Sequence, residues 1–557
     1  AYPDPITSKR IEIIKKFDAA VDISLELKEF DLLLGHVVDI YPAARSVVAD
    51  LRDRVGQRKT NAGKVAIITG LDAIADLRPF RNLGGEQHSD VYSLTVDRVR
   101  ARFAAWYSMF PRSSGTVEGK SATFKDVEAR LPAIAELGFD VLYFTPIHPI
   151  GSTNKKGKNN SLRSTPEDPG SPYAIGSAFG GHDAVEPTLG TIDDFDHLVA
   201  EAATHNMEIA LDVALQGSPD HPWAKEHPDF FTVRPDGSIK FAENPPKKYE
   251  DIYPLSFDTA AWQKLWFELE RVITFWIDHG VRSFRVDNPH TKPTIFWEWL
   301  ITRIHRTHPE VIFLSEAFTR PKVMHALAKA GFAQSYTYFT WRTERGEIED
   351  YLRELTSPDV SQYMRGNLFT NTHDINPFHL QTGGRPMFKS RFVLAATMSS
   401  LYGIYNGFEL CEATPVPGKE EYLNSEKYEY KVWDWDRPGN IKPLITLVNA
   451  ARNAHPALQE YDNLRFHSAD DARVLTYSKV SEDGTDIVLC LVSLEPVQPV
   501  DTWIHLDLGA LGLTDGVAFG VQELITGNSW TWTGAHHPVQ IDPALEPAWI
   551  LSLTKLS

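Results

Sequence analysis

The sequence is poor in cysteine and has no long apolar runs. Only Cys411 and Cys490 occur in 557 residues, too few for a disulfide framework and not spaced as a metal-binding pair. No apolar stretch reaches the roughly 18 residues that a membrane-spanning helix needs. The opening residues, AYPDPITSKR, lack the basic and apolar segments of a secretory signal. We therefore expect a cytoplasmic protein, unless a leader was removed.

Positive charge is also scarce, because the formal net charge is −18. Such a surplus of negative charge repels nucleic acid and anionic membranes at long range, so neither is expected as a partner. A neutral substrate fits best, and an anionic one would need a local cluster of cations. Apolar residues make up 42% of the chain and charged residues 23%, the balance of a globular protein. The length predicts a large domain with accessory units.

The N-terminal region, residues 1–97, is predicted to be helical. Apolar positions between Leu25 and Leu33 recur at helical spacing, and a second amphipathic stretch follows Pro42, which together indicate a helical hairpin. Its simplest role is packing or dimerisation rather than catalysis, and a homodimer is possible on this basis.

Residues 98–457 alternate between helical patterns and short buried strands. The run VLYFTPI follows a helical segment that stops at Gly138, and RSFRVDN follows another that stops at Gly280. The strand-like segments EIALDVAL, VIFLSEAF, QSYTYFTW, GNLFTNTHD and LYGIYNG repeat the arrangement. This repetition predicts an α/β fold, a closed (β/α)8 TIM barrel.

Two long insertions and a change of pattern complete the organisation. The insertions span about 147–192 and 216–257, and loops of that length in a compact domain are usually functional. From 458 to 557 the chain shows short alternating strands such as RVLTYSKV and IVLCLVSL, which predict a C-terminal all-β sandwich.

Three acidic residues come at the ends of predicted barrel strands, where barrel enzymes place their chemistry. They are Asp287 after RSFRV, Glu316 after VIFLS and Asp374 after GNLFTNTH. Retaining cleavage of a glycosidic bond needs one carboxylate as nucleophile and a second as acid and then base, roughly 5 Å apart. Neighbouring strand ends can supply that separation.

Arg285 lies two residues before Asp287, so strand alternation points both side chains the same way. A fixed cation there favours the ionised nucleophile. Taken singly, each acidic residue has a structural explanation. Asp287 could cap a helix, Glu316 could belong to a buried ion pair, and His373-Asp374 could form a turn. Their joint occurrence in this order favours catalysis.

Arg-x-Asp on one strand, Glu ending the next and His-Asp ending a later one resemble the signature segments of the α-amylase superfamily, glycoside hydrolase family 13. That resemblance implies that Asp287 is the nucleophile, Glu316 the general acid/base, and Asp374 a ligand of sugar hydroxyls in the transition state. The segments AENPPKKYEDIYP, FRVDNPHTKP, EAFTRP, QSYTYFTWR, YGIYNGFELCE and NSEKYEYK are similar to those of the α-1,4-glucan:maltose-1-phosphate maltosyltransferase family, from about residue 5 to 460.

The narrower resemblance implies a donor, an acceptor and the residues that hold them. A maltosyl unit would pass from α-maltose 1-phosphate to the nucleophile and then to the non-reducing end of an α-1,4-glucan or maltooligosaccharide, without a metal or other cofactor. The phosphate needs local cations and hydrogen-bond donors. The residues expected around it are Asn244, Lys247, Tyr249, Asn288 and Ser171. The residues expected to hold the sugars are Lys156, Gln216, Lys427 and Tyr428, with Arg285 and His373 beside them. Judged without the resemblance, Lys247 and Lys248 could be solvated loop charges.

Three features depart from the family pattern. The N-terminal β-sandwich usual in the family is expected to be absent, because AYPDPITSKRIEIIKKF resembles the last strand of that domain running into the helical insert. His373 stands where the family has proline, and Gly217 stands where cysteine is expected after Gln216. A histidine beside the reacting sugar could change the donor.

The main hypothesis is therefore maltosyl transfer with release of phosphate. The first alternative is a related transglycosylase, hydrolase or trehalose-synthase-like enzyme that uses an unphosphorylated donor. The second is a glucan-binding protein with an inactive barrel, which the presence of all three carboxylates disfavours.

Overall fold

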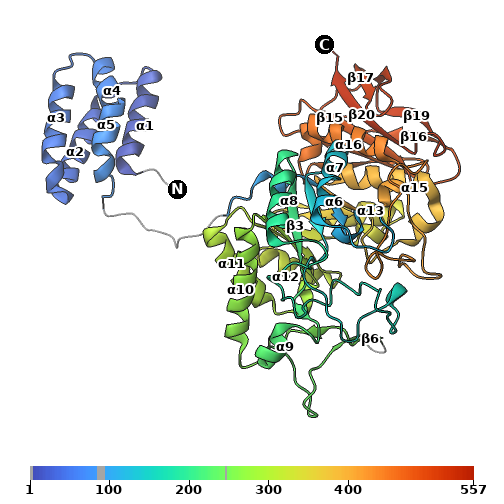
Figure 1. Cartoon of the computed structure of the whole chain (residues 1–557). Helices are drawn as coiled ribbons and strands as arrows, with labels where there is room; N and C mark the ends of the chain where they lie inside the picture. The colour runs from blue at the N-terminus through green and yellow to red at the C-terminus, as the bar shows by residue number, and fades with distance from the viewer. Residues whose placement is uncertain (1–3, 84–94, 245–246, 557) are drawn as a thin grey trace. The chain divides into compact units, whose positions relative to one another are not determined.

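The computed structural model describes residues 4–83, 95–244 and 247–556, without the side chains of Asn244 and Lys247. The chain divides into two compact units, Ala1–Leu94 and Thr95–Ser557 (Figure 1). Among the described helices, none combines the length and apolar character needed to cross a membrane.

The described part of the first unit contains five α-helices around a small apolar core. They are α1 (Pro5–Asp18), α2 (Ser24–Ile40), α3 (Arg45–Gly56), α4 (Asn61–Thr69) and α5 (Leu71–Leu77). Ile13, Phe30, Leu34 and Leu51 are buried in this core. The expected hairpin is therefore only part of the unit, because two short helices after Thr60 add a further layer of apolar side chains.

The second unit contains the closed parallel barrel predicted from the sequence. Its strands run in the order β1-β12-β11-β10-β9-β8-β3-β2, and β1 pairs with β12 to close the ring. Their bounds are β1 (Ala104–Met109), β2 (Val141–Phe144), β3 (Glu208–Val213), β8 (Ser283–Asp287), β9 (Ile312–Glu316), β10 (Gln334–Tyr336), β11 (Gly366–Phe369) and β12 (Leu401–Tyr405). The sequence patterns missed β1, whose residues AAWYSM are all buried and show no alternation.

Helices surround the barrel on its outer side. They are α6 (Phe124–Glu128), α7 (Leu131–Glu136), α8 (Ile192–Thr204), α10 (Trp262–Asp278), α11 (Thr294–Thr307), α12 (Pro321–Lys329), α13 (Arg345–Leu355), α14 (Pro358–Ser361), α15 (Phe378–Met398) and α16 (Lys442–Ala454). Gly280 adopts a φ of +88° after α10, which accounts for the stop predicted there. The expected helix before Gly138 is divided into α6 and α7, with Pro132 in the first turn of α7.

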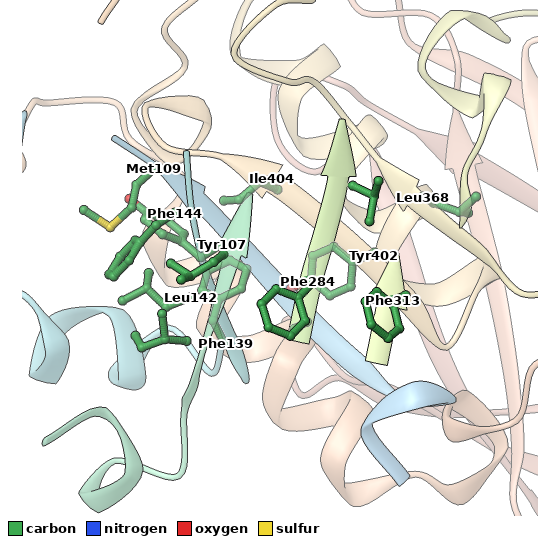
Figure 2. Close-up of a cluster of buried hydrophobic side chains, with 14 of the residues drawn as sticks. Tyr107, Met109, Phe139, Leu142, Phe144, Phe284, Phe313, Leu368, Tyr402 and Ile404 are labelled. Atoms are coloured by element: carbon green, nitrogen blue, oxygen red, sulfur yellow. The ribbon is translucent and has the colours of Figure 1, made fainter. Parts of the chain in front are cut away.

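Alternation along each strand separates two apolar layers. Outward residues such as Tyr107, Leu142, Phe284 and Phe313 pack in the layer between strands and helices (Figure 2). Inward residues form a second cluster, which includes Trp106, Tyr143, Leu314 and Tyr336. On β8, Phe284 and Val286 belong to the outer layer. Ser283, Arg285 and Asp287 therefore face the barrel interior.

The second long insertion, about 216–257, carries short elements of its own. These are β4 (Gln216–Gly217), α9 (Pro222–Glu226), β5 (Ala242–Asn244), β6 (Lys247–Tyr249) and β7 (Tyr253–Pro254). β5 and β6 form a hairpin in which Asn244 pairs with Lys247, and β4 pairs with β7. Both pairs are antiparallel and lie outside the barrel sheet.

After α16 the chain forms an antiparallel all-β domain, as the alternating strands predicted. Its strand order is β18-β17-β20-β15-β14-β13-β16-β19. The bounds are β13 (Leu464–Ala469), β14 (Val474–Val480), β15 (Ile487–Ser493), β16 (Val500–His505), β17 (Ala518–Glu523), β18 (Ser529–Thr533), β19 (His536–Ile541) and β20 (Ala548–Lys555). Cys490 is buried in β15, and both cysteines are free thiols.

Candidate active site

Asp287 and Glu316 end neighbouring barrel strands and are direct register partners. Strands in a sheet lie about 4.8 Å apart, so the two carboxyl groups project side by side. The backbone then turns sharply at Asn288, which adopts the left-handed conformation with φ 44° and ψ 52°. This turn lets the Asn288 N–H donate to Glu316 Oε2 at 3.1 Å, while its Nδ2 donates to Asp287 Oδ1 at 3.4 Å.

Arg285 connects the carboxylates from inside the barrel, where it is 1% exposed. Its Nη1 donates to Asp287 Oδ1 at 2.9 Å, as the strand alternation predicted, and its Nη2 lies 3.6 Å from Glu316 Oε1. Nη1 also donates to both carboxylate oxygens of Asp212 at 3.1 Å. One guanidinium therefore contacts three acidic groups.

Asp212 is a buried member of the site that the sequence patterns did not single out. It accepts hydrogen bonds from the hydroxyls of Tyr143 at 2.5 Å and Tyr173 at 2.7 Å. Burial raises the pKa of Asp212, while Arg285 opposes this rise. The sequence offers one indication of its importance: Asp212 stands inside the apolar run EIALDVAL, and a charge buried there without a partner would be costly.

Glu316 has the titration expected of a general acid. Burial raises the pKa of Glu316 to about 7, and Asp287 and Asp374 add to the rise, whereas Arg285 and the Asn288 N–H oppose it. A carboxyl group in this range still holds its proton near neutral pH and can give it to a leaving group.

Asp374 lies in the loop after β11, where a lysine and a histidine contact its carboxylate. Lys427 Nζ donates to its Oδ1 at 2.7 Å, and His373 Nε2 lies 3.0 Å from its Oδ2. Desolvation would raise the pKa of Asp374, but its side chain is 45% exposed, and Lys427 and then His373 hold the pKa well below its usual range. Asp374 is therefore an anion suited to binding hydroxyl groups.

His373 stacks on Tyr173 with ring centroids 5.5 Å apart, and its Nε2 lies 2.8 Å from the Tyr173 hydroxyl. The ring is 3% exposed. This departure from the family pattern thus forms part of a chain of contacts from Asp212 through Tyr173 to Asp374. The chain couples two acidic residues that lie far apart in the sequence.

A cavity of about 730 Å³ lies in front of these groups. Its lining includes Asp287 and Asp374 together with most of the sequence-predicted substrate residues: Lys156, Ser171, Gln216, Tyr249, Asn288, Lys427 and Tyr428. Arg285 and His373 are absent from this lining and contact the carboxylates instead. The volume matches a small-molecule site and can hold a disaccharide with its leaving group.

The hairpin of the second insertion contains three of the residues expected to bind the phosphate group. Tyr249 of β6 lines the cavity. Asn244 and Lys247 are paired through their backbones in the same hairpin, but their side chains lie outside the described residues. Their phosphate contacts therefore remain predictions from the resemblance.

Several lining residues are fixed by neighbours. Lys156 Nζ lies 3.9 Å from Asp251 Oδ1, and both side chains are buried. Gln216 Nε2 donates to the Tyr173 carbonyl at 3.1 Å. A Cβ at the following Gly217 would come within 3.1 Å of His221 Cβ, so cysteine there would require His221 to move.

His221 belongs to a group of three buried histidines behind the site. His182 Nδ1 lies 3.0 Å from His221 Nε2, and the His148 ring centroid is 5.7 Å from that of His182. Burial lowers the pKa values of His148 to about 3, His182 to about 4 and His221 to about 2. Within the described ranges, no group of three His, Cys, Asp or Glu side chains is arranged to hold a metal ion.

The histidine group predicts a loss of stability in weak acid. The unfolded chain takes up protons at these positions below about pH 6.5, whereas the folded chain does not until lower pH. Each histidine then lowers the free energy of unfolding by up to about 1.4 kcal/mol per pH unit as the pH falls from about 6.5 to 4. Urea unfolding at pH 7.5, 6.5, 5.5 and 4.5 measures this slope. We expect His148→Gln to make it shallower, and an unchanged slope would contradict the assignment.

Comparison with known proteins gives concordant results. Residues 466–553 match the family model described as "GLGE, C-terminal". The chain is 50% identical to the α-1,4-glucan:maltose-1-phosphate maltosyltransferase of Rhodospirillum rubrum over 100% of its own length and 81% of the relative's. It is 49% identical to the enzyme of that name from Myxococcus xanthus, over 98% and 82% of the two chains.

Solved structures show the same fold at lower identity. An α-amylase from Lactobacillus plantarum aligns with a TM-score of 0.64 and 21% identity, covering 82% of this chain and 100% of that one. A maltogenic α-amylase from Thermotoga neapolitana aligns with a TM-score of 0.64 and 19% identity, covering 82% and 99%.

Proposed function

The chain belongs to the α-1,4-glucan:maltose-1-phosphate maltosyltransferase family, and we propose that Asp287, Glu316 and Asp374 carry out its transfer of maltosyl units from maltose 1-phosphate to α-1,4-glucan. The observation that supports this assignment best is the pairing of Asp287 with Glu316 at the ends of adjacent strands, with Arg285 contacting both. Carboxyl groups about 5 Å apart favour a retaining reaction through a covalent intermediate.

In the first half-reaction, an Asp287 carboxylate oxygen attacks the anomeric carbon of the donor. The bond from that carbon to the phosphate oxygen breaks, and Glu316 gives its proton to the departing phosphate. A maltosyl ester of Asp287, hydrogen phosphate and a Glu316 carboxylate result. Asp374 binds sugar hydroxyls, most strongly as the ring flattens in the transition state.

In the second half-reaction, the 4-hydroxyl of the glucan's non-reducing end attacks the same carbon. Glu316 takes the hydroxyl proton, and the ester bond to Asp287 breaks. The two inversions give net retention, and both catalytic groups return to their starting protonation states. No step calls for a metal or an organic cofactor.

The buried surroundings of Glu316 predict the pH dependence of donor cleavage. Because its pKa is raised to about 7, the active acid form is lost as the pH rises through about 7. We expect kcat/KM for maltose 1-phosphate to fall about tenfold per pH unit above that value. Profiles of the parent and Glu316→Gln between pH 5.5 and 9 test this. Their ratio cancels the titration of the donor phosphate, and a ratio that does not change with pH would contradict the role of Glu316.

Phosphate release tests the donor directly. The protein is incubated with maltose 1-phosphate and maltohexaose, and free phosphate and product lengths are measured. We expect phosphate in step with chains lengthened by two glucosyl units. Transfer from maltohexaose alone, with no phosphate from maltose 1-phosphate, would favour the unphosphorylated donor. His373, in contact with Asp374, would then be the first residue to replace by proline.

We further propose a cytoplasmic location, supported by the two free thiols in a chain of this size. A role in carbohydrate metabolism follows from the proposed substrates. A homodimer, suggested by the N-terminal helices, is tested by sedimentation of the purified protein. The formal net charge of −18 disfavours nucleic acid and anionic membranes as partners.

A further inference from the structure

The lysines that line the catalytic cavity differ in how their charge is balanced. Among the described residues, these lysines are Lys156, Lys292 and Lys427. Lys156 faces Asp251 at 3.9 Å, and Lys427 donates to Asp374 at 2.7 Å. Each of these two cations is therefore paired with an acidic residue before any substrate binds.

Lys292 has a different environment. Its Nζ donates to Thr291 Oγ1 at 2.8 Å. Of the carboxylates in the described part of the chain, none lies within ion-pair distance of Lys292 Nζ; Asp287 and Glu316 are close enough only to act through space. Burial lowers the pKa of Lys292, and those two acidic residues oppose the effect. The cavity thus contains a partly desolvated ammonium group that has no direct counter-ion among the described residues.

The backbone conformation fixes the position from which the Lys292 side chain extends. The turn at Asn288 leads into the 3-10 helix Pro289–Thr291, and Lys292 follows with φ −119° and ψ 158°. Pro293 comes next and restricts Lys292 to this extended conformation. Pro289 and Pro293 therefore restrict the backbone around Lys292. The backbone should lose little conformational entropy when a ligand binds.

We propose that Lys292 binds the phosphate group of the donor and holds it as it leaves. The inference rests on the proposed function. The departing oxygen receives its proton from Glu316, which is paired with Asp287 across the strands, and Lys292 lines the same cavity as Asp287 and follows it by five residues. Hydrogen phosphate carries two negative charges after departure. Lys292, which has no direct acidic partner among the described residues, can form a new charge-assisted contact with it.

A phosphate is favoured over a sugar as the ligand of Lys292 because of charge. The chain has a formal charge of −18, so an anion enters this cavity only where a local cation compensates. Sugar hydroxyls are bound well by ion-paired groups such as Lys427 with Asp374, which offer a donor and an acceptor together. Lys292 offers a charged hydrogen-bond donor and no acceptor.

The experiment compares two donors that share the maltosyl unit. Lys292→Met keeps most of the aliphatic stem and removes the charge. With maltose 1-phosphate we expect kcat/KM to fall roughly ten- to hundredfold, the usual effect of losing a charge-assisted contact. With α-maltosyl fluoride, which has no phosphate, the loss should stay within about threefold. Lys292→Arg should recover part of the lost efficiency with maltose 1-phosphate.

Lys322→Met is the matched control, because it removes one exposed positive charge at the start of α12. It should change neither donor's kcat/KM. Turnover of the fluoride shows that each variant is folded. Equal losses with both donors for Lys292→Met would overturn the assignment of Lys292 and leave the proposed function intact. A parent protein that uses the fluoride but releases no phosphate from maltose 1-phosphate would overturn the proposed function and, with it, this inference.

Discussion

Replacement of Asp287 by alanine is expected to abolish maltosyl transfer, with a loss of at least roughly four powers of ten in kcat. The covalent route needs a carboxylate at the anomeric carbon, and alanine offers neither a nucleophile nor a charge. Transfer from maltose 1-phosphate to maltohexaose, followed by phosphate release, measures the effect. Activity near that of the parent would exclude Asp287 as the nucleophile.

Loss of the fold is the competing explanation and can be measured separately. Arg285 loses one partner in this variant but keeps Asp212, which accepts from the same Nη1 atom. No apolar side chain is removed, so thermal unfolding should remain cooperative. Asp212→Ala is the informative companion variant, because it removes the buried carboxylate behind Arg285 and should destabilise the protein more than Asp287→Ala does.

The second large effect is expected for Glu316→Gln, which keeps the size of the side chain but cannot donate a proton. Transfer to glucan should fall by roughly two to four powers of ten. Fluoride departs with less need for an acid than a sugar does, so α-maltosyl fluoride should still form the ester with Asp287. The ester should then accumulate, since no base activates the acceptor hydroxyl, and intact-protein mass spectrometry detects it.

Azide provides the control for this interpretation, because it attacks without losing a proton. Added azide should speed the breakdown of the accumulated ester in Glu316→Gln and release α-maltosyl azide, while leaving the parent nearly unchanged. If no ester forms with the fluoride, either Glu316 or the retaining mechanism is assigned wrongly.

The barrel could be predicted from the sequence because its strands are buried on both faces and separated by amphipathic helices. Seven strand segments and the stops at Gly138 and Gly280 were visible as patterns. The segment QSYTYFTW was only partly right, since β10 ends at Tyr336 and a 3-10 helix follows from Tyr338 to Trp341. Such details depend on neighbouring loops rather than on local propensity.

From the sequence, the site could be predicted only for residues that end a barrel strand or that lie in segments resembling the family. Asp287, Glu316 and Arg285 follow from strand order and alternation. Asp212 and Tyr173 do not, because their importance lies in hydrogen bonds between segments distant in sequence. The sequence does not single out Lys292 for a related reason: unlike Lys427, it has no direct acidic partner among the described residues, and this difference depends on the three-dimensional structure.

The closure of the barrel between β1 and β12 also bears on how activity arises during folding. The contact of Tyr173 with His373 spans 200 residues, and that of Asp374 with Lys427 spans 53. These contacts depend on strands and loops from most of the second unit, so a partial barrel brings together only some of the catalytic groups. Long-range contacts of this kind form slowly. Recovery of enzyme activity after dilution from denaturant should therefore lag behind recovery of helical circular dichroism.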